Sequence, residues 1–284
     1  MRSSWRVLAL LPLLAATACG QGVAADDDAL GAVSAAPDAL VVQVVRAGGF
    51  LPAGAAFRAV PTVSVYGDGR VVSEGPQIEL WPAPALPSVQ VGQLDADEVQ
   101  RLVDAGREVV DAAEDYGQPP VADAPTTAVV VQDGDRRAVV AAVALEELSG
   151  DLPPPDGGGL TAGQRSARER LRAYVRQVQD AASAVPTQAY TSEGLAVLAE
   201  PYGDAATPDL PPSELAWDGP ALTPGSCVVV TGADADAALD AAAAASVETR
   251  WTADGQVLRL AFRPLLPHER TCEDVQETVV PPTP

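Results

Sequence analysis

Alternating and β-branched apolar residues mark most of the strands that this chain is expected to form. Residues 40–45 (LVVQVV) predict a buried strand. The turn Gly67-Asp68-Gly69 predicts a β-hairpin with strands at 62–66 and 70–72, because glycine supplies the positive φ of a tight turn. Further strands are expected at 77–81, 88–94, 126–131, 137–143, 227–231, 249–252 and 256–262.

Helical spacing of apolar residues predicts three helices. The first begins at Asp95, which has the spacing of a capping box with Glu98, and runs to about 114. The second begins at Thr161 and runs to about 184. Its apolar face consists of Leu171, Tyr174, Val175 and Val178. An alanine-rich third helix is expected at 234–246.

The order of these elements predicts an α+β fold of two small modules, each a mostly antiparallel sheet packed by one helix. The proline- and glycine-rich stretch at 152–159 (LPPPDGGG) indicates the boundary between them. The expected organisation is a signal peptide at 1–18, a flexible tether at 19–38, a first module at 39–150, a linker at 151–160, a second module at 161–273 and a disordered tail at 274–284.

The start of the chain has the order of a secretory signal peptide. Arg2 and Arg6 precede an apolar run at 7–16, and small residues follow this run directly before Cys19. The run is about half as long as the roughly twenty residues that span a membrane. A cysteine directly after small residues resembles the lipobox of bacterial lipoproteins. This resemblance implies that Cys19 becomes the first mature residue and attaches the protein to the membrane through a lipid; the alternative is an ordinary signal peptide with Cys19 present by chance.

The other two cysteines, Cys227 and Cys272, predict one disulfide bond if the chain is exported to an oxidising compartment. A metal site built on them is the poorer interpretation, because the chain has no CxxC motif and one histidine. We therefore expect neither a metal nor a cofactor.

Composition narrows the classes of partner. The formal net charge of −21 opposes binding of nucleic acid and of anionic lipid headgroups. No lysine is present, so the phosphate-binding loop that requires one is excluded. The hydrophobic content of 47% is sufficient for a packed core.

Four arginines depart from this acidic background. Arg165, Arg168, Arg172 and Arg176 fall on one stripe of the second predicted helix. They are candidate residues for binding an anionic partner. The alternative is that they pair with acids of the same chain or cover the edge of its core.

Candidate catalytic groups are few. His268 is the one histidine, and no GxSxG motif accompanies it, so we interpret it as an exposed loop residue rather than part of a triad. Paired carboxylates could hydrolyse a glycosidic bond, but with 39 acidic residues such pairs carry no information. Trp217 and Trp251 could line a glycan groove, although core positions are the stronger interpretation.

Two proline-rich connectors, at 81–87 and 118–125, are expected to be stiff and exposed. Stiff loops lose little entropy on binding, which suits protein recognition. The simpler interpretation is that the prolines end the neighbouring elements.

Three segments are similar to a group of uncharacterised actinobacterial lipoproteins. They are 63–70 (VSVYGDGR), 117–127 (GQPPVADAPTT) and 262–267 (FRPLLP) before Cys272. The resemblance covers most of the mature chain and implies an envelope location and a shared fold, without an assigned activity. The order of elements in the first module is also similar to that of small secreted protease-inhibitor domains.

These observations predict a lipid-anchored protein on the outer face of the cytoplasmic membrane that binds another envelope protein and is not an enzyme. One alternative is a protease-inhibitor-like lipoprotein. Others are a cell-wall hydrolase that uses paired carboxylates, and a protein that captures a small ligand in a cleft at the 152–159 boundary.

Overall fold

The computed structural model describes residues 36–51, 53–77, 79–148, 159–203 and 212–279. Cys19, the signal peptide, most of the tether and most of the predicted linker lie outside the described residues. Residues Ala32–Pro284 form one compact unit. Within it the chain has an α+β fold built on two separate sheets, as expected from the order of elements.

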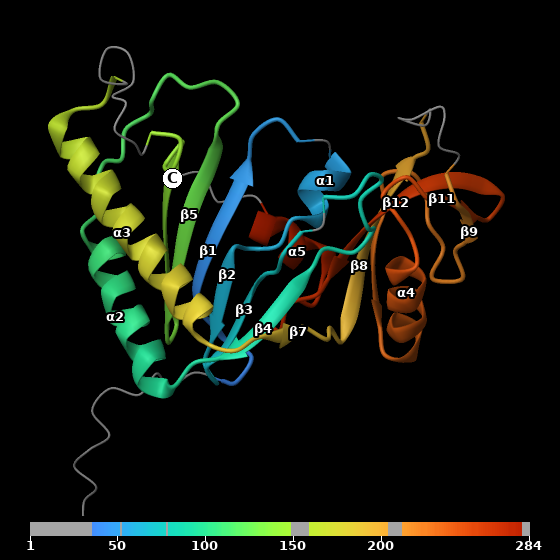
Figure 1. Ribbon diagram of the computed structural model, residues 1–284, viewed down its shortest axis with the longest axis horizontal. Coiled ribbons are helices and arrows are strands. Elements are labelled where there is room, and N and C mark those ends of the chain that lie inside the picture. The colour runs from blue at the N-terminus through green and yellow to red at the C-terminus, as the bar shows by residue number, and fades with distance from the viewer. Residues whose placement is uncertain (1–35, 52, 78, 149–158, 204–211, 280–284) are drawn as a thin grey trace, which may run out of the picture. The chain divides into compact units, whose positions relative to one another are not determined.

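The first sheet has seven strands in the order β6-β5-β1-β2-β3-β4-β7, and all neighbouring pairs are antiparallel (Figure 1). Its strands are β1 (Leu40–Gly48), β2 (Val63–Tyr66), β3 (Arg70–Glu74), β4 (Val89–Gln93), β5 (Pro125–Asp133), β6 (Arg136–Val143) and β7 (Gln188–Ala189). The predicted hairpins at 62–72 and 126–143 are confirmed, and Gly69 has the positive φ that the first turn requires.

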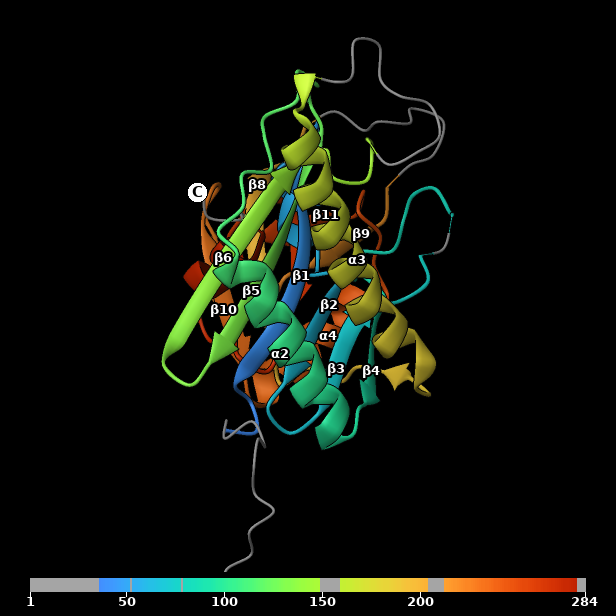
Figure 2. The ribbon, with the colours of Figure 1, turned by 90° about the vertical axis from the view of Figure 1, so that its left-hand side faces the viewer.

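Two helices, α2 (Ala96–Asp111) and α3 (Ala162–Ala184), cross one face of this sheet (Figure 2). Both begin where the sequence predicts, with Asp95 and Thr161 as N-caps. Tyr174 of α3 donates a hydrogen bond to the carbonyl of Leu102 at 2.8 Å, and its ring lies against Gly106, where a side chain would collide with it.

The placement of α3 corrects the predicted domain boundary. We expected this helix to pack on the second sheet, but its buried residues Leu171, Val175 and Val178 join the core formed with α2 and the first sheet. Strand β7, which follows α3, also extends the first sheet. The apolar stripe on α3 was visible in the sequence, but the surface that it covers depends on contacts distant in the chain. The first sheet is therefore packed by two helices.

The second sheet has five strands in the order β10-β8-β12-β11-β9. Its strands are β8 (Gly194–Pro201), β9 (Glu214–Ala216), β10 (Cys227–Thr231), β11 (Arg250–Ala253) and β12 (Gln256–Pro264). Three of the four pairs are antiparallel, and β9 is parallel to β11. The alanine-rich helix α4 (Ala233–Ala243) packs on one face together with Trp217, Trp251 and Phe262.

The other face of this sheet is covered by α1 (Ala53–Arg58) and α5 (Cys272–Val279). Phe57 and Val275 pack there against Ala196 and Ala261. Helix α5 also contacts β1 of the first sheet. We predicted a disordered tail at 274–284. This is wrong for residues 274–279, which belong to α5, because Val275 is fully buried and Cys272 is covalently fixed. Residues 280–284 lie outside the described residues.

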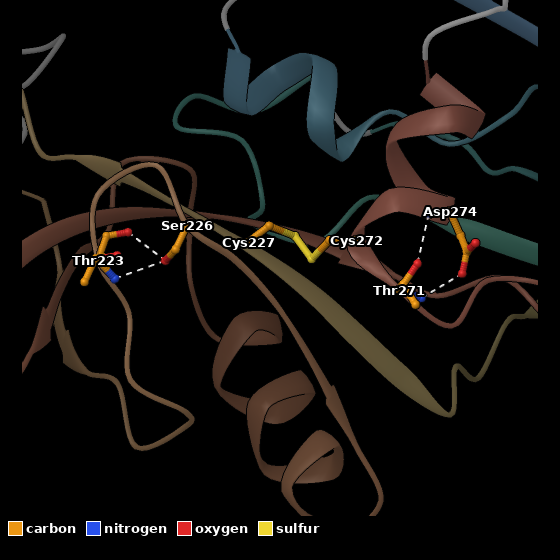
Figure 3. The surroundings of a disulfide bond; sticks show 6 residues. All are labelled: Thr223, Ser226, Cys227, Thr271, Cys272 and Asp274. Carbon is orange, nitrogen blue, oxygen red and sulfur yellow. Dashed lines mark hydrogen bonds between the residues drawn. A yellow bond between two sulfur atoms is a disulfide. The ribbon is translucent and has the colours of Figure 1, made fainter.

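The predicted disulfide between Cys227 and Cys272 is present and joins β10 to α5 (Figure 3). The two Cα atoms are 6.1 Å apart, a normal separation for a disulfide. Thr271 caps α5, since its hydroxyl accepts a hydrogen bond from the amide of Asp274 and its own amide donates to the Asp274 carboxylate.

One predicted strand is not formed. The described residues of 77–81 have no strand structure and belong to a connection between β3 and β4. Prolines at 82, 84 and 87 lack the N–H group that a ladder requires, which explains why the alternation before them does not produce a strand.

Candidate functional site

The connection between β3 and β4, described at residues 75–77 and 79–88, forms a loop that we call the Leu80–Trp81 loop. Its base is closed by a hydrogen bond from the amide of Gly75 to the carbonyl of Ser88 at 2.9 Å. The side-chain amide of Gln77 donates to the same Ser88 carbonyl and to that of Gly75. The loop therefore leaves and re-enters the first sheet at a fixed point.

The second half of the loop is attached to the segment that follows α4. The amide of Ala85 donates to the carbonyl of Ala245 at 3.0 Å, and the amide of Val247 donates to the carbonyl of Ala83 at 2.9 Å. Ala85 is buried in the core of the second sheet, so the attachment also includes apolar packing. Backbone bonds thus hold the loop at both ends.

The tip between these attachments presents two large apolar side chains to solvent. Leu80 is 61% exposed and Trp81 is 60% exposed. The peptide bond between Trp81 and Pro82 is cis. Neighbouring apolar side chains on a loop of fixed ends lose little entropy when a partner covers them, and tryptophan is among the residues that contribute most to protein interfaces.

The sequence predicts a stiff proline-rich connector at 81–87, but it also predicts a strand at 77–81 that would include Leu80. The loop is marked in the sequence by prolines at 82, 84 and 87, because closely spaced prolines exclude a central strand. The attachment to Ala245 and Val247 could not be found in this way, because those residues lie far away in the sequence.

A second polar cluster lies where the segment after β12 meets β2. The hydroxyl of Tyr66 is 3.0 Å from Nδ1 of His268. Burial raises the pKa of Tyr66 well above its ordinary value, and Glu269 and Tyr190 add to the effect. Burial lowers the pKa of His268 despite the nearby carboxylate of Glu269. His268 is partly buried, so its interpretation as an exposed loop residue was wrong.

The next residue, Glu269, forms a buried ion pair with Arg263 at 3.0 Å. Glu269 also accepts a hydrogen bond from the amide of Leu266, and Arg263 donates to the carbonyls of Ala59 and Pro264. These bonds fix the path of residues 264–269 between the two sheets.

A cavity of about 500 Å³ lies beside this segment. Its lining includes Asp38, Arg70, Tyr190, Glu193 and Arg270. Asp38 forms ion pairs with both arginines, so charges of opposite sign compensate one another at its rim. The hydroxyl of Tyr190 donates to the carbonyl of Leu265 at 2.9 Å. Asp38, Arg70, Arg270 and Tyr190 are thus engaged in contacts within the chain.

The predicted arginine stripe is not an exposed surface. Arg168 is 2% exposed and donates hydrogen bonds to the carbonyls of Tyr116, Val143 and Ala144. Arg172 is largely buried and donates to the carbonyl of Leu145.

Only two members of the stripe lie on the surface. Arg165 donates to the carbonyl of Leu160, and Arg176 is exposed. The prediction that these four arginines form one partner-binding site is therefore wrong, because the chain uses two of them to satisfy its own carbonyl groups.

The tryptophans considered for a glycan groove are core residues. Trp251 is fully buried, and Trp217 contacts its ring edge-on at a centroid distance of 6.2 Å. Phe262 completes this aromatic cluster. The alternative of a glycan groove on these rings is therefore wrong.

Among the described residues, no three His, Cys, Asp or Glu side chains lie close enough together to hold a metal ion. No helix among the same residues is sufficiently long and apolar to cross a membrane.

Comparisons with known proteins give no family for the chain. No family model matches it, and neither the curated proteins nor the solved structures contain a significant match.

Proposed function

We propose that this chain is a lipid-anchored protein on the outer face of the cytoplasmic membrane that binds another envelope protein without catalysing a reaction. The observation that carries the proposal is the Leu80–Trp81 loop, which exposes two large apolar side chains between attachments at both ends. Exposed apolar side chains that are held in place are typical of protein interaction sites.

Export is supported by two features in different parts of the chain. The disulfide between Cys227 and Cys272 is stable in an oxidising compartment and rare in a reducing one. The sequence before Cys19 has the order of a signal peptide. Lipid attachment at Cys19 would hold the folded part at the membrane through the tether that precedes Asp38.

Anchoring can be tested by metabolic labelling with a fatty-acid probe. We expect the wild-type chain to incorporate the probe and the Cys19→Ser variant to lose both the label and its retention in the membrane fraction. An unlabelled wild-type chain, or a Cys19→Ser variant that stays in the membrane, would contradict lipid anchoring.

Partner binding can be tested by photo-crosslinking in intact cells. A photoreactive amino acid at position 80 should give one discrete adduct with another protein. Position 51 is the matched control, because Leu51 is 56% exposed in a different loop. Equal or diffuse adducts at both positions would show that exposure alone explains the crosslinks and would exclude the loop as a specific site.

The same loop supports a second candidate function, inhibition of a protease. An exposed leucine–tryptophan pair between two fixed attachments could enter the cleft of a protease that prefers large apolar residues. A chymotrypsin-like protease should then be inhibited by the wild-type chain and not by Leu80→Asp. Cleavage of the loop without inhibition would exclude this function.

The hydrolase alternative gains no support from the described carboxyl groups. A carboxyl that acts as a general acid needs a raised pKa beside an ionised partner. Glu74 has a raised pKa, but the cause is burial and not a neighbouring carboxylate. We therefore do not propose hydrolysis.

A further inference from the structure

Strand β6 forms one edge of the first sheet, at the margin of the sheet in Figure 2. It pairs with β5 in an unbroken register, and within the described part of the chain no other strand pairs with its outer side. The other sheet edges are shorter: β7 has two residues, β9 has three and β10 has five. β6 has eight residues and is therefore the long open edge of the described structure.

The direction of each backbone group on β6 follows from one hydrogen bond. The amide of Ala144 donates to the carbonyl of Pro125 at 2.8 Å, so these two residues occupy a hydrogen-bonded position of the ladder. Such positions alternate along an antiparallel pair. The residues whose backbone groups point away from β5 are therefore Arg137, Val139, Ala141 and Val143.

A further contact agrees with this alternation. The carbonyl of Val143 accepts a hydrogen bond from Arg168 at 2.7 Å, on the side away from β5. The outward amides and carbonyls of Val139 and Ala141 have no hydrogen-bond partner among the described residues.

Beyond Arg136 and Arg137 at its start, β6 lacks the features that usually protect an edge. Proteins block open edges with proline, a charged side chain in the strand, a bulge or a covering segment. Residues 138–143 (AVVAAV) contain neither proline nor charge, and the register with β5 contains no bulge. The uncharged part of this edge, residues 138–143, is therefore suited to pairing with another strand.

We infer that β6 binds β6 of a second copy of this chain, in an antiparallel pair across a two-fold axis. The two-fold axis passes beside Val140. Val139 of one copy then lies opposite Ala141 of the other, and Arg137 lies opposite Val143. In this register the outward groups of Val139 and Ala141 pair with those of the other copy, whereas the outward carbonyl of Val143 already accepts a hydrogen bond from Arg168. The pairing is independent of the Leu80–Trp81 loop and of its proposed partner.

The charges at the two ends of β6 favour a second copy. Arg136 and Arg137 begin the strand, and Glu146 and Glu147 follow its end. Antiparallel pairing brings the basic start of one copy near the acidic end of the other. Arg136 already pairs with Asp111 and Glu147 with Arg46 in exposed ion pairs, which rearrange at little cost. Repulsion between the two net negative chains is screened beyond about 8 Å at physiological salt.

The helices on the sheet leave room for this arrangement. α2 contacts β1, β5 and β6, whereas α3 contacts β2 and β3. In the pair, the two β5 strands would be three strand spacings apart, about 14 Å. Packed helices need about 8–10 Å between their axes, so two α2 helices above these strands would not collide.

A pair of single strand edges is a small interface, so we expect a weak dimer that is best detected by covalent trapping. Val140 lies opposite its own copy at a non-hydrogen-bonded position, where side chains are closest. We expect the full-length Val140→Cys chain in intact cells to form a disulfide-linked dimer on mild oxidation. The parent chain and Val257→Cys, an exposed valine of the second sheet, should stay monomeric.

A second substitution tests whether the strand edge is responsible. Ala141→Pro removes an outward amide that makes no bond within the described chain, so folding should be retained. In the Val140→Cys background, Ala141→Pro should abolish the crosslinked dimer. An unchanged thermal unfolding curve would show that the variant is still folded. A monomeric Val140→Cys chain, equal crosslinking of Val257→Cys, or a crosslink to a different protein would each overturn the proposal.

Discussion

The hydroxyl of Tyr66 lies 3.0 Å from Nδ1 of His268, so a strand of the first sheet is hydrogen-bonded to the segment that leaves the second sheet. Tyr66 is fully buried, and its raised pKa keeps the phenol protonated. The lowered pKa of His268 favours a neutral ring. The phenol therefore donates and the neutral imidazole accepts at Nδ1.

Tyr66→Phe removes the donor of this bond and keeps the ring. We expect the free energy of unfolding to fall by about 1 kcal/mol, the usual net contribution of such a hydrogen bond. Urea denaturation of the wild type and the variant measures the difference. Ser183→Ala, in which an exposed hydroxyl of α3 is removed, is the control and should have little effect. An equal loss in both variants would show that the Tyr66–His268 hydrogen bond stabilises the fold no more than an exposed hydroxyl does.

Acid should destabilise the protein through His268. Its pKa in the folded state is below the ordinary 6.5, because burial outweighs the carboxylates of Glu269 and Asp274. As the pH falls through that ordinary value, the unfolded chain binds a proton that the folded chain resists. The free energy of unfolding therefore falls below about pH 6.5 and continues to fall until the folded pKa is reached.

His268→Gln isolates this effect, since glutamine has no titratable proton. We expect the stability of the variant to change less between about pH 7 and pH 5 than that of the wild type. Denaturant unfolding at several pH values measures the two curves. Parallel curves would contradict the assigned role of His268 and leave the acid response to other groups.

The buried pair of Glu269 and Arg263 should be sensitive to the loss of one partner. Glu269→Ala leaves the guanidinium without its counter-charge and the amide of Leu266 without its acceptor. We expect a loss of about 3–5 kcal/mol in the free energy of unfolding. Glu214→Ala, at the exposed pair with Arg250, should cost about 1 kcal/mol or less. Similar losses at the two sites would contradict the difference attributed to burial.

We expect Arg168 to stabilise the fold through its hydrogen bonds to backbone carbonyls and not to bind a partner protein. Arg168→Leu leaves the carbonyls of Tyr116, Val143 and Ala144 without this donor, and we expect a loss of about 3 kcal/mol or more. Arg176→Leu, on the exposed part of the same helix, should be almost neutral. If binding of an envelope partner falls in Arg176→Leu while stability is unchanged, the exposed end of the stripe has a binding role after all.

Local signals in the sequence were sufficient for most elements of the fold. The sequence predicts helix starts at Asp95, from its capping box, and at Thr161, and the structure shows both residues as N-caps. The Gly67-Asp68-Gly69 turn was equally clear, since a tight turn depends on the residues within it. The disulfide followed from having two cysteines beyond Cys19.

Features that depend on distant contacts were missed. The sequence shows an apolar stripe on α3 but not which sheet it will cover. It shows a polar segment after Cys272 but not that Val275 would find a pocket beside Phe57. The arginine stripe had the correct spacing for a surface, yet the unpaired carbonyls at the end of β6 draw Arg168 inward. Helical spacing alone cannot distinguish these outcomes.

The disulfide gives the last prediction, because it fixes α5 to β10. Cys227 and Cys272 are 45 residues apart, and closing a loop of this length stabilises the folded state by about 4 kcal/mol in the chain-entropy model. We expect Cys227→Ser/Cys272→Ser to lose about this much in the free energy of unfolding. Without the disulfide, the packing of Val275 is the main attachment of α5. We therefore expect hydrogen exchange to show that residues 272–279 lose their protection before β10 does. An unchanged stability after reduction of the wild type would contradict a structural role for the bond.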